Sequence, residues 1–477
     1  MTSRRSFLKM AGASAAAAML GGCRSLDLHD DKNKKPNIIF ILTDDQGWAD
    51  LSIPFDPQFP EACCKAFKTP NMNKFSKSAL RFTDAYAPAP ICTPTRRSIQ
   101  FGMTPARQKA PEFQGAFDPS GKWSIAQAIK QADPSYKCAH FGKWGGVITG
   151  TWKDRQSQLP GSPSHLGYDE SDGMEGVNEG GFYLREWDVG RWNINLECEP
   201  FADPKRTFSM TDKSIDFMRR QTKQGNPFYL QVSYHAIHLA SRATQETIDE
   251  YKDAPQPDRK VIKSIAPMID ELDENVGRLL DEVEKLGIDY NTYIFFTSDN
   301  GGEHWEIWYQ NAPEKNRNHP LRMHKQNLYE GGIRVPFAVK GPGVEKGGLC
   351  RVPVAGYDLL PTFYEITGGI KQIPQKLDGI SLCPLLAGDF TDEFKRPNDG
   401  LVFHRPKPAR DTVEGQSAYR QGNYKLMLFW TREGDLKRTE LYDLSKDIGE
   451  ENDLSEKMPQ KTAELKKILL DYLESVK

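Results

Sequence analysis

A cysteine in the segment Cys92-Thr93-Pro94-Thr95-Arg96 is the first candidate for chemistry in this sequence. We expect Arg97 to Phe101 to belong to a helix that begins near Pro94, because proline is favoured in the first turn of a helix. Cys92 would then lie just outside a helix N-terminus, where unpaired N–H groups and the helix dipole favour an anion. A lone cysteine, however, is more often a small buried apolar residue than a nucleophile. The rest of the chain has to decide between these two interpretations.

Two acidic pairs are the second candidate. Asp44-Asp45 directly follows one apolar run, and Asp299-Asn300 follows another. If both runs are strands of one α/β sheet, the four side chains lie at its carboxyl edge, where such sheets place their sites. Carboxylate and amide oxygens suit calcium or magnesium and suit zinc poorly. Three carboxylates would also repel one another strongly without a cation, so the pattern predicts a metal site.

The composition narrows the class of protein. The chain has 477 residues, with 38% hydrophobic and 27% charged residues, as in an ordinary globular protein. Its net charge of −2 gives no electrostatic basis for binding nucleic acid. The eight cysteines include no zinc-type C-x-x-C pair. One or two disulfides are compatible with export, but the sequence alone does not pair them.

The first 35 residues predict export. Ser3-Arg4-Arg5-Ser6-Phe7-Leu8-Lys9 precedes an alanine-rich apolar run from Met10 to Leu20, about half the ~20 residues that a membrane-spanning helix needs. This pattern is typical of a twin-arginine signal. Leu20-Gly21-Gly22-Cys23 resembles a bacterial lipobox, so we expect a lipid anchor at Cys23 and a polar tether after it. The expected location is periplasmic or at the cell surface, with the twin-arginine export machinery as a partner.

Apolar, β-branched runs predict the strands that position these residues. Such runs fit strands buried on both faces of a parallel sheet. They occupy residues 37–42, 136–141, 228–234, 293–297 and 334–340. Residues 263–286 carry apolar side chains on one helical face and end at Gly287, which predicts a crossover helix. A shorter helix begins with Thr69 as N-cap and Pro70, and residues 150–204 are expected to form loops over one face of the sheet.

The order of these elements predicts an α/β fold with a large mixed, mostly parallel sheet flanked by helices. Beyond about residue 385, shorter strands and a final amphipathic helix predict a smaller C-terminal α+β subdomain with an antiparallel sheet. We expect those strands at 401–404, 424–429 and 440–442. The predicted divisions are a signal, lipobox and tether (1–35), a catalytic α/β domain (36–385) and the C-terminal subdomain (386–477).

The chain resembles the formylglycine-dependent (type I) sulfatases of the alkaline-phosphatase superfamily. The segment from Cys92 to Arg96 is similar to the family signature C-x-P-x-R, in which the cysteine is oxidised to formylglycine (3-oxoalanine), the catalytic aldehyde. The resemblance runs from about Pro36 to the C-terminus, and the order and spacing of its motifs are jointly specific. The further motifs are Thr43-Asp44-Asp45, Thr69-Pro70-Asn71, Gly142-Lys143-Trp144, Tyr234-x-Ala236-x-His238, Thr297-Ser298-Asp299-Asn300-Gly301, Tyr329-Glu330-Gly331-Gly332-Ile333-Arg334-Val335-Pro336, Tyr419-Arg420-x-Gly422-x-Tyr424-Lys425-Leu426 and Leu441-Tyr442-Asp443-Leu444.

The resemblance implies a metal and a nucleophile. Hydrated formylglycine at position 92 would supply a hydroxyl whose pKa is lowered by Ca²⁺. The implied calcium ligands are Asp44, Asp45, Cys92, Asp299 and Asn300. A formylglycine-generating maturation enzyme is an implied partner.

The resemblance also implies the groups around residue 92. Arg96 would hold the hydroxyls of the modified residue and offset the carboxylate charge. Lys143 and Lys325 align with the sulfate-binding lysines of the family. His238 aligns with the histidine near the leaving group, which would bind sulfate or pass a proton. His235, three residues earlier, is the alternative, although the Tyr-x-Ala-x-His spacing favours His238.

Two positions depart from the family pattern. Many members have a histidine two residues after the Lys143 equivalent, proposed as the base that releases sulfate from the hydrate, whereas this chain has Gly145. Either another group, such as His140, His238 or a water molecule, performs that step, or turnover is impaired. His140 is more typical of a structural residue. Lys325 lies between His324 and Gln326, where small residues are common in the family.

The predicted function is hydrolysis of a sulfate ester on a carbohydrate or polysaccharide fragment. Asn300 favours this over the superfamily phosphatases, which use Ser or Thr and a zinc-binding Asp-His pair. The alternatives are a phosphoester or phosphonate ester hydrolase with the same aldehyde, and a non-catalytic lipoprotein that binds sulfated glycans, which Gly145 would favour. Tryptophan beside arginine in loops suits sugar faces and anionic substituents. The candidates for substrate contact are Trp144, Trp152, Arg185, Trp187, Trp192, Trp305, Trp308 and His319.

Overall fold

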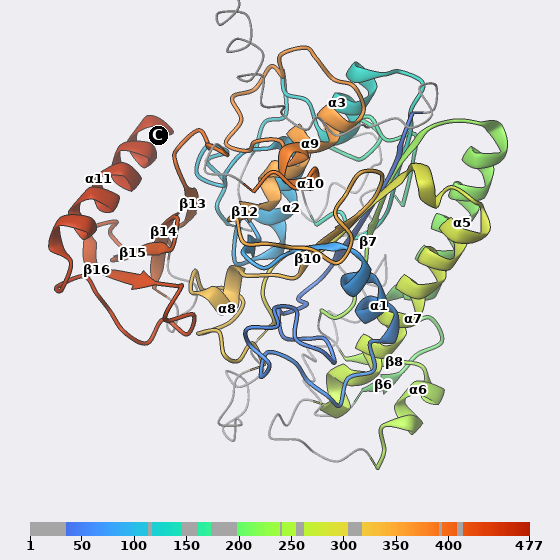
Figure 1. Cartoon of the computed structure of the whole chain (residues 1–477), viewed down its shortest axis with the longest axis horizontal. Helices are drawn as coiled ribbons and strands as arrows, with labels where there is room; N and C mark the ends of the chain where they lie inside the picture. The colour runs from blue at the N-terminus through green and yellow to red at the C-terminus, as the bar shows by residue number, and fades with distance from the viewer. Residues whose placement is uncertain are drawn as a thin grey trace, which may run out of the picture.

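A large central sheet lies between two layers of helices, and a smaller sheet with one helix adjoins it at the C-terminal end (Figure 1). This is the α/β class that the strand pattern predicts, including the small antiparallel sheet. The computed structural model describes residues 35–112, 117–145, 161–172, 198–238, 241–253, 262–303, 317–390, 394–407 and 414–477.

The central sheet has the strand order β11-β2-β10-β9-β1-β7-β4-β5 among the described residues. β1 (Asn37–Thr43) lies in the middle and pairs in parallel with β7 (Phe228–Ser233) and β9 (Thr292–Ser298). β4 (Lys137–Gly142) continues the parallel arrangement beyond β7, whereas β10 (Phe337–Lys340) is antiparallel to β9. The sheet is therefore mixed and mostly parallel, as predicted. The outer strands are β2 (Leu80–Phe82), β5 (Glu170–Ser171) and β11 (Leu349–Cys350).

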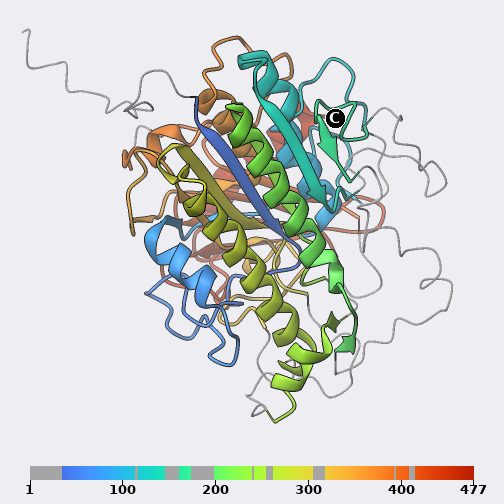
Figure 2. The same cartoon turned by 90° about the vertical axis from the view of Figure 1, so that its right-hand side faces the viewer.

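The side chains of β1 alternate between two apolar cores, as a strand buried on both faces requires. Ile39 and Ile41 pack against one layer of helices, which Figure 2 shows in front of the sheet. Ile38, Phe40 and Leu42 pack against the other layer. The first layer consists of α1 (Pro70–Ser78), α5 (Thr207–Gln224) and α7 (Ile262–Lys285), and the second of α2 (Cys92–Phe101), α3 (Ile125–Ala132) and α9 (Leu359–Ile366).

The C-terminal sheet is covered on both faces. Leu465 and Leu469 of α11 (Pro459–Ser475) pack on one face. Tyr86 and Tyr357 of the main body pack with Phe403 and other side chains of the opposite face. The strands run in the antiparallel order β13 (Leu401–Arg405), β14 (Gly415–Gln421), β15 (Tyr424–Trp430) and β16 (Leu436–Asp443).

The structure differs from the predicted elements at several places. α2 begins at Cys92, with Ile91 as N-cap, so Cys92 lies in the first turn and not outside the helix. β10 begins only at Phe337, three residues later than predicted, because Arg334 is the C-cap of the short helix α8 (Glu330–Ile333) and forms only an isolated bridge with Tyr86. The helices α3, α5 and α9 and the strand β14 were not predicted. The remaining α-helices and strands among the described residues are β3 (Ala85–Tyr86), β6 (Glu199–Pro200), β8 (Arg242–Ala243), α6 (Gln245–Glu250), β12 (Val354–Ala355) and α10 (Cys383–Leu386). Short 3₁₀ helices occupy Pro204–Arg206, Asp289–Asn291 and Gly356–Asp358.

Several sequence predictions concern cysteines and the membrane. Cys138, Cys350 and Cys383 are buried as free thiols. Among the described residues, no helix has the length and apolar character needed to cross a membrane. The predicted signal, lipobox and tether lie outside the described residues, which begin at residue 35.

Candidate functional site

The two acidic pairs meet at the carboxyl edge of the central sheet. Thr43 of β1 is opposite Ser298 of β9, and the backbone N–H of Asp299 donates to the carbonyl of Thr43 at 3.1 Å. The chain turns sharply after β1, because Asp45 has a φ of 61°, in the left-handed region that non-glycine residues rarely adopt. The N–H of Asp45 donates to Oδ1 of Asp299 at 3.2 Å, which joins the two strand ends.

These side chains fit a hard cation. Oxygen atoms of Asp44, Asp45 and Asp299 lie within 4.8 Å of one another, and all three residues are buried. Oδ1 of Asp44 and Oδ1 of Asn300 are buried oxygen atoms without a hydrogen-bond partner. Buried polar atoms nearly always have partners, and unpaired oxygens beside a carboxylate cluster are what an oxygen-coordinated calcium ion needs.

Three buried cations balance the three carboxylates. Arg96 donates to Oδ2 of Asp299 from Nε at 2.8 Å, and its Nη2 lies 2.7 Å from the same oxygen. Lys143 pairs with Asp44, and Lys325 pairs with Oδ2 of Asp45 at 2.7 Å. Repulsion between the carboxylates therefore does not by itself require a metal ion, because side-chain cations already offset their charge. The unpaired oxygens, and not uncompensated charge, now support the metal site.

Burial and these ion pairs shift the pKa values of the side chains in the cluster. Burial lowers the pKa of Lys143, but Asp44, Cys92 and Asp299 together outweigh burial and hold that pKa above the ordinary value. Burial likewise lowers the pKa of Lys325, but Asp45 and Glu303, with smaller effects of Cys92 and Asp44, keep it well above its ordinary range. Burial, followed by Asp44, raises the pKa of Asp299 to about 6. Both lysines are therefore charged at neutral pH and suited to binding an anion.

Cys92 opens α2 beside this cluster. The side chain is buried, and the hydroxyl of Thr95 fixes the approach to the helix through bonds with the backbone N–H and carbonyl of Ala89 at 3.2 and 2.9 Å. Burial raises the pKa of the Cys92 thiol, and Asp299 and Asp44 raise it further against the opposite effect of Lys143. A neutral thiol is a poor nucleophile, so the environment disfavours direct thiolate chemistry at this position.

The histidines occupy three different environments. Nε2 of His238 lies 3.9 Å from Oδ2 of Asp45, and 18% of its side chain is exposed. His235 is 1% exposed, and neither of its ring nitrogens has a hydrogen-bond partner. His140 lies in β4, with Nε2 3.2 Å from the hydroxyl of Ser233 and its ring against Trp144. His140 thus has the structural surroundings that the sequence suggests for it.

Gly145 has no room for a histidine. Its φ is +74°, and a Cβ atom built on it would lie 2.6 Å from Cδ of Arg96. Nη1 of Arg96 donates to the carbonyl of Lys143 at 2.8 Å, so the arginine fills the space beside this turn. Glycine in place of histidine at position 145 therefore leaves the space that the Arg96 side chain occupies.

The structure also brings in residues that sequence analysis missed. Arg317 donates from Nη2 to the carbonyl of Asp45 at 2.8 Å and from Nε to both carboxylate oxygens of Asp50 at 2.9 Å. It thereby supports the left-handed turn at Asp45. Glu303 lies 3.2 Å from Nζ of Lys325. Asp50 is detectable as a third acid in the first motif, but no local pattern marks Arg317, which reaches the turn from more than 270 residues away.

Two of the predicted substrate contacts, Trp144 and His319, lie among the described residues. Trp144 is 1% exposed, and its indole N–H donates to the carbonyl of Gly161 at 3.0 Å, so it anchors a turn and does not present a face to a sugar. His319 is half-buried. The other candidates, Trp152, Arg185, Trp187, Trp192, Trp305 and Trp308, lie outside the described residues.

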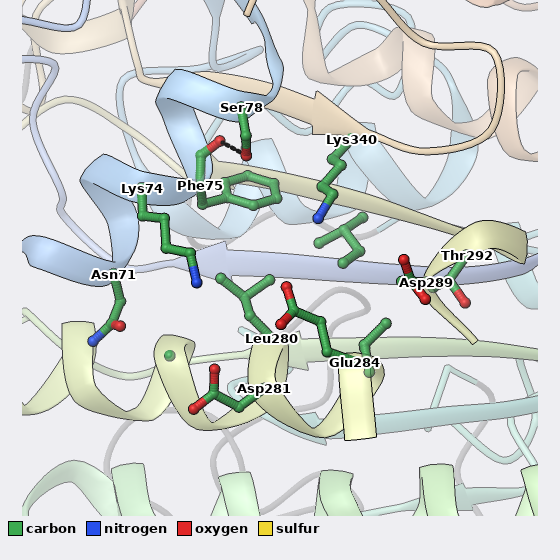
Figure 3. A pocket seen from close by; sticks show the side chains of 13 residues that line it. Asn71, Lys74, Phe75, Ser78, Leu280, Asp281, Glu284, Asp289, Thr292 and Lys340 are labelled. Atoms are coloured by element: carbon green, nitrogen blue, oxygen red, sulfur yellow. Dashed lines mark hydrogen bonds between the residues drawn. The ribbon is translucent and has the colours of Figure 1, made fainter. Parts of the chain in front are cut away.

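A separate pocket lies at the other end of the parallel strands, near the first residue of β9 (Figure 3). It is lined by residues of α1 and α7 and by Thr292, the first residue of β9, whereas Asp299 follows the last. Figure 3 shows Lys74 and Lys340 on one side and Glu284 on the other. Because Asp281 and Asp289 also line it, the pocket has no excess of positive charge and is not a second anion site.

Comparisons with known proteins agree with this geometry. Residues 36–370 match the family model described as Sulfatase, and residues 321–477 match the model described as N-sulphoglucosamine sulphohydrolase, C-terminal. Residues 1–21 match the twin-arginine translocation pathway signal sequence, so the chain is exported.

Individual proteins are also similar along most of the chain. A sulfatase of Formosa agariphila is 27% identical over 91% of this chain and 87% of its own length. The structure of Ps i-CgsB in complex with k-i-k-neocarrahexaose has a TM-score of 0.71 and 23% identity, covering 92% of this chain and 93% of its own. A second structure, in complex with its substrate D-glucosamine-2-N,6-O-disulfate, has a TM-score of 0.69 and 18% identity, covering 93% and 98%. At these identities the two structures show a shared fold.

Proposed function

The chain belongs to the sulfatase family and is a sulfuric ester hydrolase, and from this premise we propose that it releases sulfate from a sulfated carbohydrate. The observation that carries the proposal is the cluster of three carboxylates and three cations beside Cys92, with two unpaired oxygens on Asp44 and Asn300. The family makes the non-catalytic alternative the weaker one.

We propose that Asp44, Asp45, Asp299 and Asn300 hold Ca²⁺, together with residue 92. When bound, calcium would lower the pKa of a coordinated hydroxyl and thereby supply a nucleophile at neutral pH. Formylglycine made from Cys92 would supply that hydroxyl. The high pKa of the Cys92 thiol supports a modified side chain over a thiolate nucleophile.

The charge balance of the site supports an anionic substrate. Without a ligand, Arg96, Lys143 and Lys325 neutralise the three carboxylates. A calcium ion would add two positive charges, and a sulfate dianion released as product would add two negative charges, so binding both leaves the net charge of the buried cluster unchanged. A buried cluster is stable only if its charges are paired in this way.

The side chains of the site have distinct proposed roles. Arg96 holds Asp299 and orients the hydroxyl of residue 92. Lys143 and Lys325 bind sulfate oxygens and stabilise the charge that develops on them and on the leaving oxygen. Burial, Lys325 and Lys143 lower the pKa of His238 to about 3 in the absence of a ligand, so its imidazole is uncharged before substrate binds. It can then donate a hydrogen bond to sulfate or the leaving oxygen.

The proposed substrate class rests on the relatives. A similar structure contains the substrate D-glucosamine-2-N,6-O-disulfate, and the C-terminal family model is described as that of an N-sulphoglucosamine sulphohydrolase. We propose that the exported chain is anchored by a lipid at Cys23 and acts outside the cytoplasm. A maturation enzyme would have to modify residue 92 before export, because the twin-arginine pathway moves folded proteins. The divisions at residues 35 and 385 are also part of this proposal.

Release of inorganic sulfate from a panel of sulfated mono- and oligosaccharides tests the proposal. We expect release by the mature protein with calcium, and none by Cys92→Ala or in the presence of a chelator. Matched phosphate and phosphonate esters are included as substrates. Turnover of those esters without any sulfate release would favour the alternative hydrolase, and full activity of Cys92→Ala would overturn the proposed nucleophile.

A further inference from the structure

His235 is a buried imidazole without hydrogen-bond partners at the edge of the site. It is 1% exposed, and both ring nitrogens are unpaired. A neutral imidazole has one N–H donor and one acceptor, and leaving such groups unpaired in a protein interior is destabilising. A native structure tolerates this cost most readily where a ligand completes the bonds.

The backbone places His235 beside the sulfate-binding region. β7 and β4 are paired up to Ser233 and Gly142, and the N–H of Lys143 donates to the carbonyl of Ser233 at 2.8 Å. His235 and Lys143 therefore leave neighbouring strands at the same edge. The N–H of Ile237 donates to the carbonyl of Asp44 at 2.7 Å, which holds the segment after His235 against the acidic cluster.

The groups around this imidazole are positively charged. Burial, followed by Lys143, Arg96, Lys205 and Arg206, holds the pKa of His235 well below its ordinary value. An imidazole in this setting stays neutral, and a metal cation would be repelled. The ligand that can both pair with an N–H and lie among these cations is an oxyanion.

The charge of Lys205, just before the start of α5, acts on both His235 and His238. Lys205 is 4% exposed and lies in the turn Pro204–Arg206, where Lys205 and Arg206 both have left-handed backbone angles, with φ of 57° and 55°. Arg206 is partly engaged elsewhere, since its Nη2 lies 3.6 Å from Oδ1 of Asp172. Lys205 is thus a buried cation whose charge lowers the pKa of both histidines.

We infer that His235 and Lys205 form an additional oxyanion subsite next to Lys143, in which the neutral imidazole donates a hydrogen bond and Lys205 supplies charge. The inference deepens the proposed function and rests on it for the substrate class. The oxyanion is either the sulfate that is released or a second sulfate or carboxylate on the same sugar.

Binding of inorganic sulfate separates these two sources. Isothermal titration calorimetry uses the full mature protein with calcium, and compares wild type with His235→Ala and Lys205→Met. We expect sulfate affinity to fall at least tenfold in both variants if the subsite holds the released sulfate. If it holds a second group, sulfate affinity is unchanged, but KM rises at least tenfold for doubly anionic sugars and not for singly sulfated ones.

Matched controls distinguish binding from folding. His165→Ala and Lys213→Met remove an exposed histidine and an exposed lysine, and we expect wild-type constants for both. His235→Asn, which keeps an N–H donor, and Lys205→Arg, which keeps the charge, should recover most of the affinity at wild-type thermal stability. They also carry the test if His235→Ala does not fold.

Sulfate affinity and both KM values within twofold of wild type in folded His235→Ala and Lys205→Met would overturn the inference. Calorimetry measures sulfate binding and needs no turnover, whereas the proposed function is measured by sulfate release. The two can therefore fail independently. A wild-type protein that binds sulfate through these residues but releases none from any sugar would contradict only the proposed function.

Discussion

Replacing Arg96 by glutamine should change the stability of the protein in a calcium-dependent way. The Arg96 side chain is 2% exposed, with Nε and Nη2 at 2.8 and 2.7 Å from Oδ2 of Asp299 and Nη1 at 2.8 Å from the carbonyl of Lys143. Removing one partner of a buried ion pair costs about 3–5 kcal/mol, because the other charge stays buried. We expect Arg96→Gln to lose that amount in the presence of a chelator.

Calcium should recover part of this loss. Nη2 of Arg96 lies 4.0 Å from Oδ1 of Asp44, one of the unpaired oxygens. A unit charge at this distance contributes about 4 kcal/mol at an effective dielectric constant near 20, so the guanidinium must oppose a bound cation. If only about 1.4 kcal/mol survives relaxation, calcium binds Arg96→Gln about tenfold more tightly than wild type.

The assay is denaturant unfolding with and without calcium, in a Cys92→Ala background so that maturation cannot differ between variants. Arg107→Gln is the matched control, because Arg107 makes a similar two-bond pair with Asp378 at 2.8 and 2.7 Å. Its loss should not depend on calcium. An Arg96→Gln variant that gains no more stability from calcium than Arg107→Gln would refute the placement of the metal beside Asp299 and Asp44.

Three further predictions concern other residues. Burial raises the pKa of Glu450 from 4.5 to about 7, so its contribution to stability is fully present below pH 4.5 and is lost as the pH rises through 7. The stability of wild type relative to Glu450→Gln should therefore fall by about 2–3 kcal/mol between pH 5 and 8, and equal pH profiles of the two proteins in urea would contradict it. Gly145→His should lower stability by about 1–3 kcal/mol, because of the left-handed φ and the clash with Arg96, without raising sulfate release; higher kcat in a stable variant would show that position 145 does accept a histidine base. Arg317→Gln should weaken calcium binding at least tenfold by releasing the turn at Asp45, whereas an unchanged calcium Kd measured by calorimetry would limit Arg317 to a structural role.

Strands and motifs could be predicted because their signals are local. The apolar run that forms β1 and the acids that follow it are contiguous, and the parallel register then fixes that Asp44 and Asp299 meet. The start of α2 was placed too late, because Pro94 was taken to mark the first turn, whereas the helix begins two residues earlier at Cys92. Cys92 is therefore the first residue of the helix, and not a residue just before its N-terminus.

Contacts between distant segments could not be predicted. Arg317 and Lys205 lie in stretches without a regular pattern, and only the fold brings them to Asp45 and to His235. The charge balance of the site was missed for the same reason, since Lys143 and Lys325 reach the carboxylates from different parts of the chain. The family resemblance implied sulfate binding by these lysines, but not that they pair with the carboxylates proposed to hold the metal.

The chemical state of residue 92 is the central point of the proposed function. Cys92 begins α2 as a buried side chain whose thiol has a raised pKa, beside carboxylates with unpaired oxygens. Mass spectrometry of the peptide that contains residue 92, taken from protein with measured sulfate release, tests it most directly. We predict an aldehyde in place of the thiol, in proportion to the specific activity. Full activity in protein whose residue 92 is an intact cysteine would contradict the account.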